Sequence, residues 1–464
     1  MDEITSVTVE EMCAAREARA MAQMTLLSRH KGAVVVCLTM NIAGPVKRSE
    51  RCDRAFDEGE RAVRAILAPH KLHFAHTIRE KTGCEAIFCV EGDPSEIKRR
   101  LCTLEDAQPI GRLWDIDVLY GMGEKVSRTD LGLPPRKCLL CGNDAPVCAR
   151  SRIHTLIALS EKTKEIIDAH FCESFIRQTA QQAQRALLTE VAVSPKPGLV
   201  DRENNGAHSD MDIFTFMDSA CALRDYFESC TRIGMAHNVP RAEACFDALR
   251  VPGLLAEEAM NRATGGVNTH KGAIFSLGIY CAALGMSYIS GKAHAEYAFS
   301  FCSAMTREQM RRELDALRSR EREATTFGEM LCQSSHNGGV REEAARGFPS
   351  VKNVGLPRLK EALAAGLSLN DAGLCALVAL MTCVSDTNAV RRGNPEGAYK
   401  MQQDAKALDS EIAAALASGT IKTFDLAGRM RDWDAVLTLQ NISPGGCADM
   451  LALTLLSAFA EGVA

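Results

Sequence analysis

The chain has 464 residues, enough for two or three domains, and its 46% hydrophobic and 24% charged residues are ordinary for a folded globular protein. A net charge of −5 excludes a global basic field, so we expect no nucleic-acid partner. The acidic start has no apolar run of the secretory type. The longest apolar stretch, 448–460, is shorter than the roughly 20 residues that span a bilayer, so no membrane association is expected. Most of the 19 cysteines stand singly in apolar runs, which indicates reduced thiols in a cytoplasmic protein.

Residues 1–150 alternate between helix and strand signals, which predicts a mixed α/β domain. Thr8-Val-Glu-Glu11 has the form of a capping box and predicts a helix from about Val9 to about Arg29. The β-branched run 34–40 predicts a strand. Further strands are expected at 85–90 and 112–119, and further helices at 56–67 and from Pro94, which Asp93 caps.

From about Ser151 onward strand signals almost vanish, and apolar residues repeat at helical spacing. We therefore predict an all-α, multi-helix C-terminal domain whose polar site is built from interhelical loops. The boundary is expected between Asp168 and Leu188, which gives domains of residues 1–168 and 175–464. Gly, Pro and Asn mark the predicted loops at 194–212, 264–272, 335–358, 386–397 and 441–447.

A carboxylate pair marks the last strand of the first half. Side chains alternate along a strand, so Asp115 and Asp117 share one face, roughly 6–7 Å apart. Two such carboxylates suit Mg²⁺ and displacement at phosphorus with pyrophosphate leaving. The nearby side chains of Arg112, Arg128 and Arg136 would neutralise the phosphates. As an alternative, the solvated face of an amphipathic strand explains the pattern of the two aspartates equally well.

A cysteine and histidine cluster follows this strand. Cys138, Cys141, Cys148 and His154 are zinc-ligand types, but their spacing departs from the common finger patterns. Reduced thiols that pack a turn are therefore favoured over a bound zinc.

The segment Ser194-Pro-Lys-Pro-Gly-Leu-Val-Asp201 opens the main candidate site. Its prolines and glycine forbid a regular helix, and Lys196 stands between the prolines as a candidate phosphate ligand. The alternative is that Lys196 is a solvent-exposed loop lysine without a binding role. The carboxylates and amides that follow are candidates for metal ions and phosphates: Asp201, Asn204, Asn205, Asp210 and Asp212.

Four further loops have the same polar character. His270 and Lys271 precede an apolar helix, whose amides attract anions. In His336-Asn-Gly-Gly-Val-Arg-Glu-Glu343, Arg341 is a candidate phosphate clamp and Glu343 a candidate base. Asp386 and Asp449 are candidate metal ligands with Asp201, Asp210 or Asp212, although each could equally cap a helix. Asn388 and Asn441 are candidate nucleotide-binding residues in the same loops.

These motifs together resemble two known families. Gly111-Arg-Leu-Trp-Asp-Ile-Asp117, Ser127 to Arg136 and Cys138 to His154 resemble the holo-citrate lyase synthase family, also called apo-citrate lyase phosphoribosyl-dephospho-CoA transferase. Residues from about 175 onward resemble the triphosphoribosyl-dephospho-CoA synthase family, through Ser194–Asp201, Thr269–Ala273, Asp386–Asn388 and Asn441–Gly446. Glu342 and Cys447 depart from that second pattern. The whole chain looks like a fusion of the two enzymes.

The resemblance implies two steps. The helical half would join ATP to 3′-dephospho-CoA and release adenine, and the α/β half would transfer the product to a serine of the apo acyl-carrier subunit of citrate lyase and release pyrophosphate. Breaking the glycosidic bond of ATP passes through an oxocarbenium-like state that a carboxylate stabilises, while another deprotonates the attacking hydroxyl. Asp201, Asp212 and Glu343 are candidates for these roles. Mg²⁺ and the cationic side chains of Lys196, Lys271 and Arg341 would hold the triphosphate.

Three alternatives remain open at this point. The first is the equivalent enzyme of malonate decarboxylase, which differs in its acceptor protein. The second is a general Mg²⁺-dependent nucleotidyltransferase or phosphohydrolase, which would release phosphate or pyrophosphate without adenine. The third is a carrier-protein scaffold without turnover.

Overall fold

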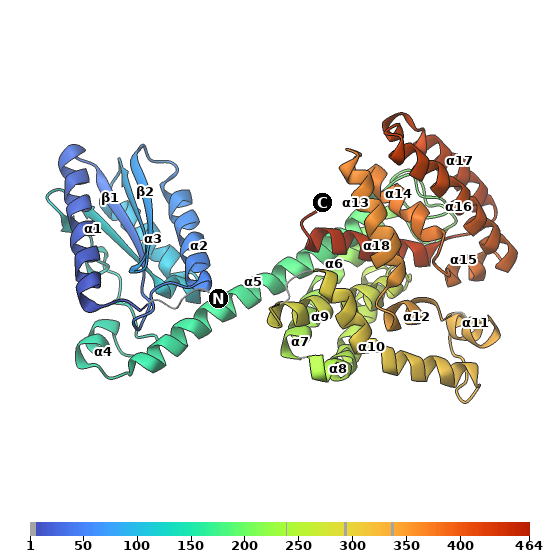
Figure 1. Ribbon diagram of the computed structural model, residues 1–464, viewed down its shortest axis with the longest axis horizontal. Helices are drawn as coiled ribbons and strands as arrows, with labels where there is room; N and C mark the ends of the chain where they lie inside the picture. The colour runs from blue at the N-terminus through green and yellow to red at the C-terminus, as the bar shows by residue number, and fades with distance from the viewer. Residues whose placement is uncertain (1–5, 238, 292–294, 336–337) are drawn as a thin grey trace. The chain divides into compact units, whose positions relative to one another are not determined.

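The computed structural model describes residues 6–237, 239–291, 295–335 and 338–464. By its internal contacts the chain divides into two compact units, residues 1–174 and 175–464, and each is described by itself (Figure 1). The division falls inside helix α5, Leu156–Ala192.

The first unit contains a five-stranded antiparallel sheet with strand order β2-β3-β1-β4-β5. Central β1 pairs with both β3 and β4, and its Cys37 lies opposite Ile87 and Asp117. Strand β2 was not predicted because it lies at the sheet edge and buries none of its side chains fully, so its sequence lacks a clear apolar alternation. The strands are β1 Val34–Met40, β2 Leu72–Glu80, β3 Gly83–Val90, β4 Trp114–Tyr120 and β5 Glu124–Lys125.

Helices cover both faces of this sheet (Figure 1). On one face, Phe56 of α2 packs with Phe88 and Trp114 in the larger core of the unit, to which α3 also contributes. On the other face, Leu26 and Leu27 of α1 pack against β1 and β3. The helices are α1 Val9–Arg29, α2 Glu50–Leu67, α3 Pro94–Asp106 and α4 Ala145–Ser151, with short 3₁₀ turns at Pro109–Leu113 and Thr129–Leu131.

Local sequence motifs correctly predicted where several of these helices and strands begin. The capping box of α1 is present: the Glu11 backbone N–H donates to Thr8 Oγ1 at 3.3 Å, and the Thr8 backbone N–H donates to Glu11 Oε2 at 3.0 Å. Asp93 caps α3 as predicted. The strand expected from Arg112 begins at Trp114 instead, because Pro109–Leu113 forms the preceding 3₁₀ turn.

In the second unit every described element is helical, as predicted. Two of the expected loops, 335–358 and 386–397, contain short helices instead of irregular chain, and His336 and Asn337 lie outside the described residues. The helices are α6 Ile213–Ala222, α7 Arg224–Ala236, α8 Ala242–Ala263, α9 Lys271–Ile289, α10 Ala295–Arg318, α11 Phe327–Ser335, α12 Gly339–Ala345, α13 Leu356–Ala364, α14 Leu369–Met381, α15 Thr387–Arg392, α16 Pro395–Ala417, α17 Leu426–Leu439 and α18 Gly445–Ala460. Single turns lie at Val239–Arg241, Val351–Gly355 and Ile421–Thr423.

Three apolar helices form the centre of this unit. α9, α14 and α18 are buried on nearly all sides, and α18 packs against both of the others. α9 is long and apolar enough to cross a membrane, but 78% of its apolar window is buried inside the unit, as expected for the core helix of a globular domain.

α7 and α9 make the closest approach in this core. A Cβ placed on Gly234 of α7 would lie 1.9 Å from the Ala282 carbonyl oxygen of α9, and a Cβ on Gly285 of α9 would lie 2.3 Å from the Thr231 carbonyl oxygen of α7. Only glycine permits the two backbones to lie so close together.

We therefore expect Gly234→Ala to destabilise the helical unit by about 1–3 kcal/mol, because the added methyl group must push the two helices apart. Thermal and urea unfolding of the full chain, followed by circular dichroism, measures the effect.

Gly253→Ala in α8 is the matched control, because among the described residues a Cβ there would meet only Tyr226 Oη, at 3.9 Å, apart from the backbone of its own helix. It should leave stability unchanged or raise it by up to about 1 kcal/mol through helix propensity. Equal unfolding midpoints for the two variants would contradict the close approach.

Candidate active sites

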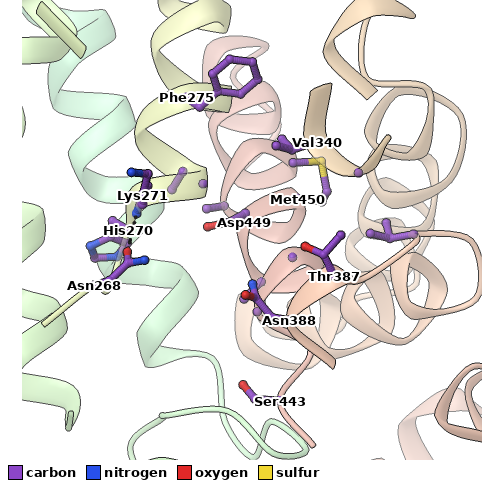
Figure 2. A pocket seen from close by; sticks show the side chains of 18 of the residues that line it. Asn268, His270, Lys271, Phe275, Val340, Thr387, Asn388, Ser443, Asp449 and Met450 are labelled. Atoms are coloured by element: carbon purple, nitrogen blue, oxygen red, sulfur yellow. Dashed lines mark hydrogen bonds between the residues drawn. The ribbon is translucent and has the colours of Figure 1, made fainter. Parts of the chain in front are cut away.

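A cavity of about 940 Å³ opens among the helices of the second unit. Its wall combines the segment before α6 with the first turns of α9, α12, α15 and α18 (Figure 2). The predicted residues that line it are Lys196, Asp210, His270, Lys271, Arg341, Glu343, Asn388 and Asp449. Asp201, Asn204, Asn205, Asp212, Asp386 and Asn441 are not among the lining residues.

Asp449 lines the cavity from an otherwise apolar helix. It lies near the N-terminal end of α18, beside the start of α9 (Figure 2). A Cβ on Gly272 would lie 1.9 Å from Asp449 Oδ2, so the carboxylate takes the space that the glycine leaves. Burial, with Glu190 and Asp386 nearby, raises the pKa of Asp449 well above its usual range. Asp449 has no ion-pair partner within the described part of the chain.

Lys196 is fully buried rather than an exposed loop lysine. Its Nζ forms an ion pair with Glu190 of α5 and donates to the Glu190 carbonyl oxygen at 2.7 Å. Burial raises the pKa of Glu190, and the adjacent ammonium partly offsets that rise. Sequence reasoning missed Glu190, although an isolated acid inside the apolar run Leu187–Val193 was an available signal.

Asp201 shapes the loop that presents Lys196. Its carboxylate accepts hydrogen bonds from the backbone N–H groups of Lys196 (2.6 Å), Glu203 (2.6 Å) and Asn204 (3.2 Å). The neighbouring Gly198, at φ +68°, donates to Asp434 Oδ1 at 2.8 Å. The structure thus places Asp201 against the backbone of its own loop.

Other predicted acids and amides hold backbone in the same way. Asp212 caps α6 and accepts from the Thr215 backbone N–H at 2.9 Å. Asp386 caps α15 and also accepts from the Cys447 N–H at 2.8 Å. Asn204 donates to Asp434 Oδ2 at 2.8 Å. Asn441, at φ +55°, donates to the Arg392 carbonyl oxygen at 3.2 Å.

His270 presents a defined hydrogen-bond donor. Thr269 Oγ1 donates to Ser219 Oγ at 2.8 Å, and Ser219 Oγ lies 2.7 Å from His270 Nδ1. We assign the Ser219 proton to this second contact, which leaves the imidazole proton on Nε2. Burial lowers the pKa of His270 to about 3, so the ring is neutral at pH 7 and carries its proton on Nε2. This buried Nε2 has no partner among the described residues, while the residue lines the cavity (Figure 2). It can donate to a substrate oxygen.

Basic side chains surround the rest of the cavity. Lys271 Nζ lies 2.7 Å from Glu257 Oε2, and Arg341 Nη2 lies 3.1 Å from Glu329 Oε1. Glu343 accepts from the Ser350 backbone N–H and hydroxyl, and burial raises its pKa. A cavity lined by cations and carboxylates, with the neutral imidazole of His270 as a further donor, suits a polyphosphate bound with a divalent ion. The remaining basic lining residues are Arg346, Arg391 and Arg392.

The carboxylate pair of the first unit lies on β4, as the alternation predicted. Asp115 and Asp117 are exposed or half-exposed between the buried Trp114, Ile116 and Val118. Asp117 forms an ion pair with Lys125 of β5. Asp115 has no ion pair within the described residues.

A third acid, which sequence reasoning missed, shares this face. Glu85 of β3 and Asp115 of β4 lie on opposite sides of Thr39 of β1 in the strand register. Glu85 pairs with Arg19 of α1, and its burial raises its pKa.

The nearby arginines mainly hold the strand in place. Arg136 pairs with the buried Glu105 and donates to the Trp114 carbonyl oxygen at 2.9 Å. Arg128 also pairs with Glu105, at 3.3 Å, and Arg112 donates to the Lys137 carbonyl oxygen.

Comparison with known proteins identifies both units. The family described as ATP:dephospho-CoA triphosphoribosyl transferase (CitG) matches residues 176–463, and the family described as apo-citrate lyase phosphoribosyl-dephospho-CoA transferase (CitX) matches residues 7–170. The chain belongs to both families. The predicted fusion is thereby confirmed.

Full-length relatives have the same organisation. The chain is 34% identical over 460 residues to Protein CitXG of Haemophilus influenzae, covering 97% of this chain and 96% of that protein. It is 33% identical to Protein CitXG of Leuconostoc mesenteroides subsp. cremoris, covering 96% and 95%. The helical unit alone is 39% identical over 280 residues to a probable 2-(5''-triphosphoribosyl)-3'-dephosphocoenzyme-A synthase of Pectobacterium carotovorum, covering 60% and 87%.

The raised pKa of Asp449 predicts a pH dependence of stability. The folded state keeps this carboxyl protonated where the unfolded chain ionises it. Its contribution is therefore fully present below the unfolded pKa of about 4 and is lost as pH rises through the raised pKa. We expect the melting temperature of the ligand-free wild type, relative to Asp449→Asn, to fall as the pH rises above about 4. A constant difference between wild type and Asp449→Asn would contradict the buried, unpaired carboxyl.

Proposed function

We propose that this chain makes and attaches the prosthetic group of citrate lyase. Residues 175–464 would convert ATP and 3′-dephospho-CoA into 2′-(5″-triphosphoribosyl)-3′-dephospho-CoA and adenine. The N-terminal unit would transfer this product to a serine of the apo acyl-carrier subunit and release pyrophosphate. The single observation that carries the proposal is the match of both families along one chain whose relatives share that full length.

In the first step, the ribose 2′-hydroxyl of dephospho-CoA attacks the anomeric carbon of ATP. A new C–O bond forms, the bond to adenine N9 breaks, and adenine leaves with that electron pair. Positive charge develops on the ribose ring, so a nearby carboxylate lowers the barrier. We assign this charge stabilisation, or the uptake of the hydroxyl proton, to Asp449 and Glu343, which line the cavity with raised pKa values.

Binding of the triphosphate is assigned to Lys271, Arg341 and the Nε2–H of His270. Asp449 and Asp210 are oxygen donors of the type that holds Mg²⁺ beside phosphates, and a bound ion would favour the ionised form of Asp449 over the protonated form of the ligand-free protein. Mg²⁺ would neutralise the triphosphate there.

In the second step, the acceptor serine oxygen attacks the α-phosphorus of the triphosphate. A P–O bond forms, the bond to the β-phosphate bridging oxygen breaks, and pyrophosphate leaves. Asp115 and Asp117 are the carboxylates suited to hold Mg²⁺ on this strand face, and Asp115 has no competing ion pair within the described residues. We place the protein in the cytoplasm, which agrees with its 19 free thiols.

We expect purified full-length protein, given ATP, dephospho-CoA and Mg²⁺, to release adenine that chromatography detects, together with a CoA derivative heavier by one triphosphoribosyl unit. Asp449→Asn should lower this rate at least about 100-fold, because the variant removes a group that contacts the reacting centre or its metal. Phosphate or pyrophosphate release without adenine would instead support the general nucleotidyltransferase.

The two activities should separate by mutation. Asp115→Asn should keep wild-type adenine release but lower attachment to the apo acyl-carrier subunit of citrate lyase by about 100-fold or more, since it removes a ligand used only in the transfer. Mass spectrometry of the carrier measures attachment. Asp449→Asn supplied with the finished triphosphoribosyl compound should still label the carrier. Preferential labelling of a malonate decarboxylase carrier would show that the acceptor belongs to malonate decarboxylase and not to citrate lyase. Unchanged carrier labelling by Asp115→Asn would show that Asp115 has no role in the transfer.

A further inference from the structure

Four metal-ligand side chains converge in the segment that follows the transferase strand. One donor atom from each of Cys138, Cys141, Cys148 and His154 lies within 4.8 Å of every other. The Cys141 and Cys148 sulfurs are 3.4 Å apart, and His154 Nε2 lies 3.3 Å from the Cys141 sulfur. The spacing in the sequence favoured packed thiols, but this convergence favours a bound ion.

The local backbone is folded around these side chains. Lys137 and Asp144 form an antiparallel bridge, and the Cys138 backbone N–H donates to the Asn143 carbonyl oxygen at 2.7 Å, which closes the turn that carries the first two cysteines. The Leu140 backbone N–H points to the Cys138 sulfur at 3.5 Å. Helix α4 follows at once and supplies Cys148.

The end of α4 returns the last ligand to the cluster. Arg152 ends the helix in the left-handed region at φ +47°, where a non-glycine side chain is strained. This turn brings His154 back to the Cys141 sulfur.

The distances fit a tetrahedral zinc ion. Zn–S bonds of about 2.3 Å and Zn–N bonds of about 2.0–2.1 Å place neighbouring ligand atoms roughly 3.5–3.8 Å apart. A disulfide would need sulfurs about 2.05 Å apart, so these thiols are not oxidised partners.

Hydrophobic packing does not explain the cluster. Cys148 is the only buried residue of α4, and the other three ligands are partly exposed. A segment with so little apolar burial needs another source of order.

We propose that Cys138, Cys141, Cys148 and His154 bind one structural Zn²⁺. Four protein ligands fill a tetrahedral site and leave no open position for substrate, so the ion orders the chain rather than joining the chemistry. The segment that it orders begins beside Arg136, which holds the first residue of β4 through the Trp114 carbonyl oxygen. Zinc would therefore stabilise the first residue of β4, the strand that carries Asp115.

Metal analysis of the full-length protein tests the site directly. Protein purified without added metal, analysed by inductively coupled plasma mass spectrometry, should contain about one zinc per chain. Cys141→Ser should lose most of it, whereas Cys13→Ser, which changes an exposed cysteine outside the cluster, should retain it. A wild type that lacks zinc and takes up none on reconstitution overturns the proposal, as does full zinc retention by Cys141→Ser.

Cobalt substitution keeps the proposal falsifiable if Cys141→Ser fails to fold. Wild-type protein stripped with a chelator and refilled with Co²⁺ should show thiolate-to-cobalt charge-transfer bands and the ligand-field bands of a tetrahedral ion. The absence of these bands would overturn the site. Stripping should also lower the melting temperature of the N-terminal unit and slow carrier labelling. With Mg²⁺ restored, adenine release should continue, because the synthase cavity lies in the other unit.

Discussion

The helical unit depends on one unusual placement, a half-buried carboxylate close to the start of a core helix. Asp449 occupies the space beside Gly272 where any larger residue would collide with it, and α9 and α18 are apolar almost everywhere else. Partial burial of a carboxyl without an ion-pair partner is unfavourable for folding, and such a group in a cavity is a candidate for a functional site. The cavity, its cations and the neutral imidazole of His270 are arranged around that acid.

The two units handle phosphate chemistry in different environments. In the synthase unit, the carboxylates are buried among helices, so their protonation and any bound ion are governed by low polarity. In the transferase unit, Asp115 and Asp117 lie on an exposed strand face. An open face suits a step whose acceptor is the side chain of another protein, whereas a cavity suits a step between two small molecules that must exclude water.

Sequence reasoning worked where one strong periodicity governed the chain. The helices of the second half were predictable because their apolar residues repeat at helical spacing, and β4 was predictable because acids alternate with buried residues. Edge strand β2 was missed because it has no clear apolar alternation, and Glu190 was missed although it stands as a lone acid inside an apolar run. Asp201 and Asp212 were counted as site residues on composition alone. A short acid after a turn can bind backbone amides as well as a ligand, and residue spacing cannot distinguish the two uses.

The loop held by Asp201 has a consequence for how such proteins are recognised. Its stretch of prolines, lysine and glycine is the most distinctive sequence motif of the helical unit. Three backbone N–H groups nevertheless donate to Asp201, so this motif has a structural role in forming the cavity wall. The hydrogen bonds of this stretch therefore explain its residue types by the fold of the loop alone. Asp449, one acid in an otherwise apolar terminal helix, would be the better marker of activity if it has the role proposed above.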